Sequence, residues 1–331
     1  MRVLVTGGAG YIGSVSVEAL LEAGHEPVVL DDASTGHPAA VPAGVPFFRQ
    51  DYTDERATAA ALEAHRVEAI LHCAARSLVG ESVRHPSRYF RQNVAGGIGL
   101  LEAARAAGVR RFVFSSTAAV YGTPDVTPIP EDAPLRSINP YGETKRIVES
   151  ALDWYGRAYG MRSVSLRYFN AAGASQANGE HHDPETHLIP NVLAAAGGGE
   201  PVTLFGDDYP TPDGTPIRDF VHVLDIADAH VRALEATERN DGPAFLACNL
   251  GSGTGFSVRE VLTAAELVVG RPIPVQVGPR RPGDPPILVA AIDRARETLG
   301  WTARHGTLEA MIESAWAWRR RHPDGYRDTI K

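Results

Sequence analysis

Residues 3–13 read VLVTGGAGYIG, and this stretch decides the fold. An apolar, β-forming run enters a turn with glycines at positions 7, 8, 10 and 13, and apolar residues at helical spacing follow it. A strand, a tight turn and a helix in this order form a phosphate cradle. Backbone N–H groups at the helix start favour an anion, and glycines let it approach the main chain. We therefore predict a dinucleotide-binding turn, the alternative being a structural turn without a ligand.

Asp31 indicates which dinucleotide is bound. It ends a second apolar run, at the place where a carboxylate is expected to accept hydrogen bonds from the adenosine ribose. Arg49 is the only arginine or lysine between Asp31 and Gln50, so a 2′-phosphate would find no nearby partner. We expect the cofactor to be NAD rather than NADP.

Composition excludes several classes of partner. The chain has 331 residues, enough for one large domain and a smaller one, and a formal charge of −8. That charge argues against binding to nucleic acid or to an anionic membrane surface. The first strand begins at about Arg2, which leaves no room for a secretory signal, and no apolar run is long enough to cross a membrane. We expect a cytoplasmic protein.

The cysteines suggest neither redox chemistry nor a metal site. Cys73 and Cys248 fall in separate predicted strands, and we find no Cys-x-x-Cys motif and no clustered histidines. Two reduced, buried thiols in a cytoplasmic protein are the simplest interpretation. We therefore expect no metal ion.

The first half of the chain alternates strands and helices, which predicts a Rossmann-type, doubly wound parallel α/β sheet. We predict an NAD-binding domain at 1–170 and a smaller α/β substrate domain, mainly at 171–331, with segments at about 221–250 returning to the first. Strands are expected at 45–48, 69–75, 113–115, 163–169 and 245–250. Helices are expected at 86–108, 140–159, 223–238, from 257 onward and at 308–320. Long loops at 171–183 and 206–216, with a helix between them, are expected to carry function.

The second decisive motif is YGETK, in which Tyr141 and Lys145 share one face of a predicted helix. Bringing a tyrosine pKa from about 10 to about 7 takes roughly 4 kcal/mol. That shift requires Lys145 and the positive nicotinamide ring to act together. Such a tyrosine could exchange a proton with a sugar hydroxyl while the cofactor takes a hydride from the same carbon. Taken alone, the pair is more typical of a solvated helix face.

The order of these motifs resembles the extended short-chain dehydrogenase/reductase family: a glycine-rich turn, Asp31, Thr117 after a central strand, then Tyr-x-x-x-Lys. Within that family the chain is similar to nucleotide-sugar 4-epimerases, from residue 1 to about 326. The most specific segments are VGES (79–82), SSTAAVYG (115–122), NPYGETK (139–145), LRYFNAAGA (166–174), GDDYPTPDGTPIRDFVHV (206–223) and RRPGD (280–284).

The resemblance implies a role for each matching residue. Catalysis would fall to Tyr141, Lys145 and Thr117. NAD would contact Gly7, Gly10, Tyr11, Ile12, Gly13, Asp31, Asp32, Ala33, Ser34, Thr35, Gly36, Asp51, Tyr52, Cys73, Ala74, Ala75, Ser77, Asn93, Ser115, Tyr141, Lys145, Tyr168 and Phe169. A UDP-sugar would contact Thr117, Tyr141, Asn170, His187, Leu188, Phe205, Arg218, Arg281, Asp284 and Leu288.

The implied reaction is NAD-dependent 4-epimerisation of UDP-hexoses by transient oxidation at C4, rotation of the keto sugar and return of the hydride. A homodimer, formed through helices around 88–107 and 150–159, is also implied. Two positions depart from the family pattern. Ser77 stands where a lysine is frequent, with Arg76 beside it, and Leu288 stands where some relatives carry a large aromatic residue against the sugar 2-substituent. Epimerisation of UDP-N-acetylhexosamines or of another UDP-sugar is therefore the main alternative.

Other activities within the family are less compatible with the residues. A 4,6-dehydratase would carry an Asp-Glu pair directly after Thr117, where this chain has Ala118 and Ala119. A net dehydrogenase would release NADH. A non-catalytic NAD-sensing protein usually lacks the Tyr/Lys pair that this chain retains.

Overall fold

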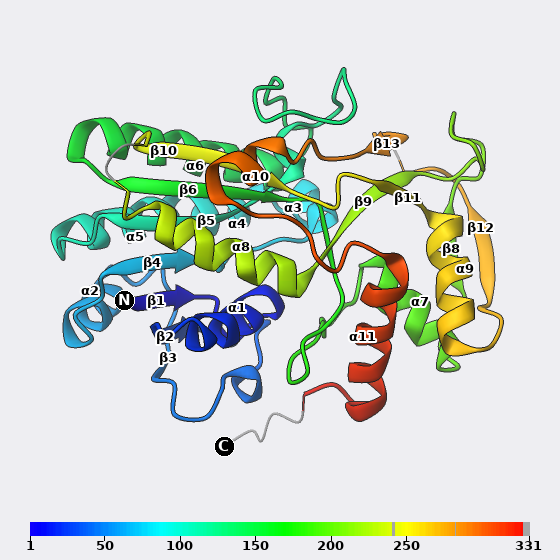
Figure 1. Cartoon of the computed structure of the whole chain (residues 1–331), viewed down its shortest axis with the longest axis horizontal. Coiled ribbons are helices and arrows are strands. Elements are labelled where there is room, and N and C mark those ends of the chain that lie inside the picture. The colour runs from blue at the N-terminus through cyan, green and yellow to red at the C-terminus, as the bar shows by residue number, and fades with distance from the viewer. Residues whose placement is uncertain (240–241, 282, 327–331) are drawn as a thin grey trace.

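A parallel sheet of seven strands forms the centre of the molecule (Figure 1). The computed structural model describes residues 1–239, 242–281 and 283–326, and the following description is confined to them. In spatial order the strands are β10 (Phe245–Leu250), β6 (Arg162–Tyr168), β5 (Arg111–Thr117), β4 (Ala69–His72), β1 (Arg2–Thr6), β2 (Glu26–Asp31) and β3 (Phe47–Arg49). The predicted Rossmann-type fold is confirmed. The strand order reverses between β1 and β4, which is where ligands bind in sheets of this kind.

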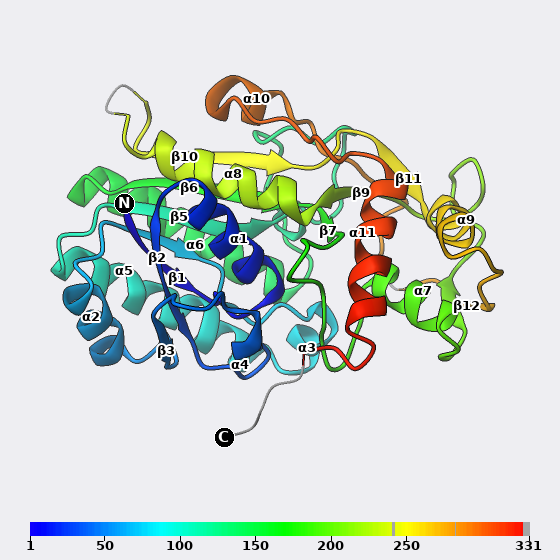
Figure 2. The same cartoon turned by 60° about the horizontal axis from the view of Figure 1, so that its bottom comes forward.

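Helices cover both faces of this sheet, because alternate side chains of each strand point to opposite sides. Val3 and Val5 pack with α1 (Tyr11–Glu22) and α8 (Val223–Ala236). Leu4 packs with α2 (Glu55–Ala64), α5 (Gly96–Ala106) and α6 (Pro140–Tyr159). Figure 2 shows α1 and α8 side by side on their face, and α10 (Asp293–Leu299) contacts α8 and β10.

The segment between β4 and β5 is less regular than predicted. It contains α3 (Val79–Arg84), α4 (Pro86–Tyr89) and a π-helical stretch, Phe90–Ala95, before α5 begins. The single helix predicted at 86–108 is therefore interrupted, and the π-helical stretch places Asn93 toward the interior. The strand predicted at 69–75 ends at His72, because Cys73 N and Ala74 N both donate to Thr6 O. Cys73 thus lies beyond its strand, whereas Cys248 lies within β10 as predicted.

The chain leaves the large sheet after β6 and builds a smaller layer beside it. Four short strands form one small sheet, namely β7 (Asn170–Ala172), β9 (Ile217–His222), β11 (Gly255–Ser257) and β13 (Ile287–Leu288). β8 (Val202–Phe205) pairs with β12 (Val275–Gly278), and α7 (Leu188–Ala196), α9 (Val258–Val269) and α11 (Leu308–Arg321) share an apolar core. The division of the chain after residue 170 stays a prediction. No helix among the described residues is long and apolar enough to span a bilayer.

Candidate active site

The glycine-rich turn is packed too tightly to accept side chains. A phosphate group could therefore approach its main chain directly. Gly7 has φ 73°, and a Cβ on it would lie 2.5 Å from Ala74 N, across the β1–β4 crevice. A Cβ on Gly13 would lie 2.0 Å from Gly7 O. Gly10 caps α1 without a side-chain hydrogen bond, so no side chain occupies the helix start. Tyr11 and Ile12 form the first turn of this helix, where backbone N–H groups favour an anion.

Asp31 organises the loop beside this turn. Its buried carboxylate accepts hydrogen bonds from Ala9 N at 3.0 Å and from Ala33 N at 2.8 Å. Burial raises the pKa of Asp31, and these two N–H groups counteract the rise. Asp32 accepts from Ser34, and Thr35 leads to Gly36, where a Cβ would lie 3.0 Å from Ala9 C. The predicted adenosine-side residues therefore surround the glycine turn.

Asp51 and Tyr52 lie after β3 and are joined to the π-helical stretch. The Tyr52 hydroxyl donates to Gln92 O at 2.6 Å, and the Gln92 amide donates to Asp51 at 3.2 Å. Tyr52 is buried. The loop predicted to contact adenine is thus held by the residue next to Asn93.

Asn93 is a brace between two predicted site elements. Its amide accepts from Arg76 N at 2.9 Å and donates to Arg76 O and to the Thr144 hydroxyl, both at 3.0 Å. Ser77 is exposed, and the Arg76 guanidinium lies 3.9 Å from Glu81. The polar atoms of the Asn93 side chain are therefore engaged by the protein itself, and Arg76 is paired with a carboxylate.

The Tyr141 and Lys145 side chains lie at the carboxyl end of β5, but not as a close pair. The Thr117 side chain lies close enough to Tyr141 to affect the pKa of its phenol, and the Tyr141 ring centroid lies 6.0 Å from Lys145 Nζ. Lys145 is buried, donates to Ser115 O at 2.7 Å and lies 4.7 Å from the centroid of the Phe114 ring. Burial raises the pKa of Tyr141, and Thr117 lowers it. Lys145 keeps its ammonium charge in the hydrogen bond to Ser115 O, so its predicted effect on the Tyr141 phenol stays a prediction.

Burial also lowers the pKa of Lys145, to about 8. Cys73, directly after the neighbouring strand β4, offsets part of this effect, as does Glu149 one helical turn later. The charge on Lys145 therefore depends on how far water enters the site.

A chain of polar side chains runs beneath the site from β5 to α1. Ser115 donates to Cys73 Sγ at 3.2 Å, and Tyr168 donates to Ser115 at 2.8 Å. Tyr168 also contacts His230 Nε2, whose Nδ1 lies 2.9 Å from the Ser16 hydroxyl. Burial raises the pKa of Cys73 to about 11, so its thiol stays protonated. Sequence reasoning missed Ser16 and His230, since each lies on an apolar helix face without a recognisable motif.

A buried ion pair fixes the strand that carries Thr117. Glu149 accepts from Arg167 Nη2 at 2.6 Å and from the Ser116 hydroxyl at 2.6 Å, and both charged side chains are at most 4% exposed. Arg167 also donates to Tyr121, which donates to Asn249. Glu149 was not predicted, although its spacing from Lys145 puts both on one helix face.

The residues predicted to hold the nucleotide come together from β8, β9, β13 and the loop between β12 and β13. The Arg281 guanidinium carbon lies 4.1 Å from the centroid of the Phe205 ring, and Arg218 donates to Asp284 at 2.6 Å. Leu288 pairs with Arg218 in the small sheet, and it packs against the same apolar cluster as Phe169. Leu288 therefore links the nucleotide residues to the Tyr141 end of the site.

Segment 173–178 crosses α1 and is fastened to it. Tyr11 donates to Gly173 O at 2.7 Å, and Ser175 donates to Glu18 at 3.1 Å. Asn178 also donates to Glu18. The glycine turn and the start of the second half of the chain are thus held together by side chains.

The remaining predicted substrate residues lie on either side of this segment. Asn170 is exposed at the start of β7, and Leu188 is the first residue of α7. His187 Nδ1 lies 2.7 Å from Glu180 and 2.9 Å from Glu185, and His182 completes the group. The prediction that histidines do not cluster is wrong, because this loop folds back on itself.

Comparison with known proteins gives consistent relatives. Residues 3–251 match the model of the "NAD dependent epimerase/dehydratase family". The UDP-glucose 4-epimerase of Corynebacterium glutamicum is 49% identical over 96% of this chain and 95% of its own length. The UDP-glucose 4-epimerase of Brucella ovis, solved in complex with NAD, is 45% identical, covers 96% of this chain and 98% of that one, and has a TM-score of 0.92. The Bifidobacterium longum enzyme, solved with NAD⁺ and UDP, is 35% identical over 98% and 100% of the two chains, with a TM-score of 0.92.

Proposed function

Because the chain belongs to the NAD dependent epimerase/dehydratase family, we propose that it is an NAD-dependent enzyme that interconverts UDP-glucose and UDP-galactose. The observation that carries the proposal is that Tyr141, on α6, lies beside Thr117 at the carboxyl end of β5, next to the dinucleotide crevice. A proton-transferring phenol and a second hydroxyl at that place are what reversible oxidation of a sugar carbinol requires.

In this proposal the crevice between β1 and β4 holds the dinucleotide. Gly7, Gly10 and Gly13 allow the tight turn whose main chain the pyrophosphate would approach, and Asp31 is the hydrogen-bond acceptor for the adenosine ribose. When bound, NAD accepts a hydride from C4 of the sugar and returns it to the same carbon. The remaining predicted cofactor contacts stay proposals of the same kind.

The protein's own groups handle the proton and the nucleotide. Tyr141 removes the proton of the 4-hydroxyl group and returns it, while Thr117 orients that hydroxyl. Lys145, when charged, favours the phenolate of Tyr141. The Arg218 and Arg281 guanidinium groups are suited to the diphosphate, for which their parallel N–H donors are matched.

The sugar must rotate while the nucleotide stays bound. The protein therefore has to hold the nucleotide tightly and the sugar loosely. Phe205 and Asp284 belong to the proposed nucleotide grip, together with Asn170, His187 and Leu188. Ala118 and Ala119 supply no acid or base, which favours simple epimerisation over dehydration. Leu288 is smaller than an aromatic residue, which supports a second candidate substrate class, the UDP-N-acetylhexosamines.

We also propose that the protein acts as a cytoplasmic homodimer. The acidic composition and the absence of a long apolar segment in the sequence support the location. Exposed aromatic residues on α6, Trp154 and Tyr159, support a contact between copies.

The direct test is incubation of the purified protein with UDP-galactose and, separately, with UDP-N-acetylgalactosamine. We expect the gluco partner of the first to form without accumulation of NADH. Stoichiometric NADH, or the absence of any epimer, would contradict the proposal.

Substitution of the proposed base tests the mechanism. Tyr141→Phe is expected to lower turnover by about 10²–10⁴-fold, because proton transfer is lost while bound NAD is retained. Turnover is measured by separation of the two UDP-hexoses, and bound NAD by its release on denaturation. Turnover near that of the wild type would remove Tyr141 from its role.

A further inference from the structure

A cluster of metal-ligating side chains lies outside the proposed reaction centre. Glu180, His182, Glu185 and His187 each offer one ligand atom, and these atoms all lie within 4.8 Å of one another. His187 Nδ1 is 2.7 Å from Glu180 Oε1 and 2.9 Å from Glu185 Oε1. His182 Nδ1 is 3.4 Å from Glu180 Oε1 and 3.6 Å from Glu185 Oε2. Each imidazole therefore lies close to both carboxylates.

The spacing of these atoms suits a tetrahedral cation. Ligands at about 2.0–2.1 Å from a tetrahedral Zn²⁺ ion lie roughly 3.3–3.4 Å from each other. The imidazole–carboxylate contacts of 2.7–3.6 Å lie around this value, and all four ligand atoms lie within 4.8 Å of one another, so rotation of the side chains would be needed to complete the geometry. With both imidazoles deprotonated, as metal coordination requires, the four groups carry a charge of −2, which one divalent cation balances. Without an ion, burial lowers the pKa of the two imidazoles, but the carboxylates outweigh it and hold the pKa above its usual value, so the ion would displace the ring protons.

We propose that Glu180, His182, Glu185 and His187 bind one divalent transition-metal ion, best matched by Zn²⁺. Imidazole nitrogen with carboxylate oxygen is a donor set that favours Zn²⁺ over Ca²⁺ or Mg²⁺, which prefer oxygen alone. With all four positions filled by the protein, the site is structural. This inference goes beyond the proposed function, in which no step uses the ion.

The carboxylates are positioned before any ion arrives. Glu185 Oε1 accepts hydrogen bonds from Thr186 N and His187 N, both at 2.8 Å, which fixes its orientation. The Glu180 side chain is only 8% exposed and that of Glu185 only 19%. Partly desolvated carboxylates facing each other across two imidazoles gain more from a cation than exposed ones would.

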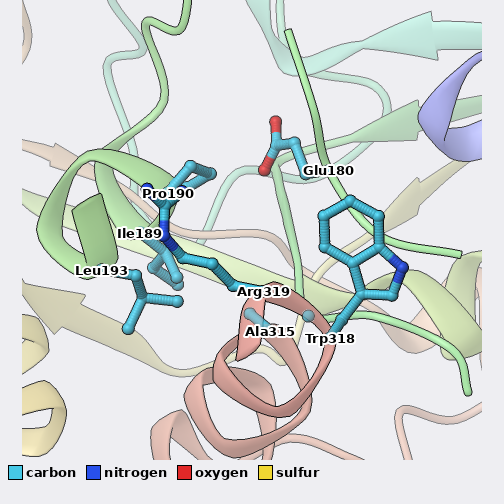
Figure 3. A pocket seen from close by; sticks show the side chains of 8 residues that line it. Glu180, Ile189, Pro190, Leu193, Ala315, Trp318 and Arg319 are labelled. Carbon is cyan, nitrogen blue, oxygen red and sulfur yellow. The ribbon is translucent and has the colours of Figure 1, made fainter. Parts of the chain in front are cut away.

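The location of the cluster indicates what the ion would stabilise. Glu180 and Glu185 interact electrostatically with Tyr11 of the glycine turn, and His187 directly precedes α7. Glu180 also borders a small cavity of about 20 Å³ between α7 and α11, where Pro190 and Trp318 lie on other sides (Figure 3). A bound ion would fasten loop 180–187 between the dinucleotide turn and α7. Any contact of His187 with the nucleotide would then have to use its other ring nitrogen.

The test uses the full-length protein stripped with a chelator, then supplied with Zn²⁺ or Co²⁺ alone. We expect one equivalent of Zn²⁺ to remain after desalting, measured by elemental analysis. We expect the Co²⁺ form to show the intense visible bands of tetrahedral coordination. Zn²⁺ should also raise the melting temperature in a concentration-dependent way, because it binds only the folded chain.

Variants distinguish this site from non-specific binding of the metal ion by surface histidines. His182→Gln is expected to weaken Zn²⁺ binding by on the order of 100-fold and to abolish the tetrahedral bands. Glu180→Gln should do the same. His85→Gln, which removes an exposed histidine outside the cluster, should leave stoichiometry and spectrum unchanged. Equal melting temperatures of the metal-free variants and the metal-free wild type show that the variants fold.

Weak or octahedral Co²⁺ binding, or equal Zn²⁺ retention by His182→Gln and the wild type, would overturn the proposal. Cation-free pairing between the imidazoles and the carboxylates would then explain the cluster. Metal content and spectrum do not depend on turnover. Epimerisation without metal binding would contradict this inference alone. Metal binding without epimerisation would contradict only the proposed function.

Discussion

Lys145 is a cation in surroundings that disfavour charge. It is 3% exposed, and burial lowers its pKa from 10.5 to about 8. Between these two values the unfolded chain binds a proton that the folded chain has released, so raising the pH stabilises the fold. The gain between pH 8 and pH 10 is on the order of 2 kcal/mol.

Lys145→Met should lack this gain. We expect the free energy of unfolding of the wild type, relative to the variant, to rise by about 2 kcal/mol from pH 8 to pH 10, measured by urea denaturation without added dinucleotide. A difference between the two proteins that stays constant with pH would contradict the assignment of a buried, charged lysine.

Leu288 allows a prediction on substrate choice. It sits opposite Arg218 in the small sheet and packs against the cluster around Tyr121. Leu288→Tyr is expected to reduce kcat/KM for UDP-N-acetylgalactosamine by about 10–200-fold relative to UDP-galactose, because the larger ring narrows the space for the acetamido group. Leu288→Met, of similar volume, is the control. An equal loss for both sugars would place Leu288 away from the 2-substituent.

At the scale of single residues, the sequence predicted which side chains belong to the candidate site, but not the surroundings of each side chain. Tyr141, Lys145 and Thr117 were recognisable from motif and order. The environment of Lys145 and its separation from Tyr141 were not, because both depend on Ser115 and Phe114, which the fold brings from β5 against helix α6.

The helix α1 and its turn form the element most sensitive to a single methyl group. A Cβ on Gly13 would lie 2.0 Å from Gly7 O, so the turn would have to open. Gly13→Ala is expected to destabilise the protein by about 1–3 kcal/mol and to abolish binding of NAD, measured by thermal denaturation and by titration with NAD.

Gly80→Ala is the matched control for this change. Gly80 lies in α3, and a Cβ there would meet nothing within 4 Å. Stability equal to or up to about 1 kcal/mol above the wild type is expected, since alanine is the better helix former. Equal losses in the two variants would show that the turn is not closely packed.

Elements with strong end signals were predicted well, and short ones were not. The bounds of α6 match the prediction, because Asn139 caps it, Pro140 starts it and Gly160 ends it in a left-handed conformation. The Ser257–Glu260 capping box of α9 is also confirmed. The strands of the small layer lie among glycines and prolines and have little apolar alternation, so only their pairing partners define them.

At the scale of the whole molecule, the outer surface of α6 carries a prediction. Trp154 is 62% exposed on this helix. Trp154→Glu is expected to convert the proposed dimer to a monomer, measured by sedimentation, because a charge would enter an apolar contact. Leu267→Glu is the control, since Leu267 is 74% exposed on α9, far along the chain. A monomeric wild type, or dissociation of both variants, would contradict the assignment.

The large sheet could be predicted from the sequence because only a few topologies are compatible with a chain in which strands and helices alternate. It could not predict which distant loops meet. Arg281 and Phe205 are brought together by the small layer, whereas His187 and Glu180 meet because one loop folds back on itself, and only motif resemblance pointed to some of these residues.

The fastening of segment 173–178 to Tyr11 and Glu18 has a kinetic consequence. This segment is bound to the helix whose start forms the glycine turn, and we expect a dinucleotide bound at that turn to leave only after the segment detaches in a local opening event. Exchange with labelled NAD in the medium is then expected to be slower than a catalytic cycle. One resident cofactor molecule would serve many turnovers and would survive purification.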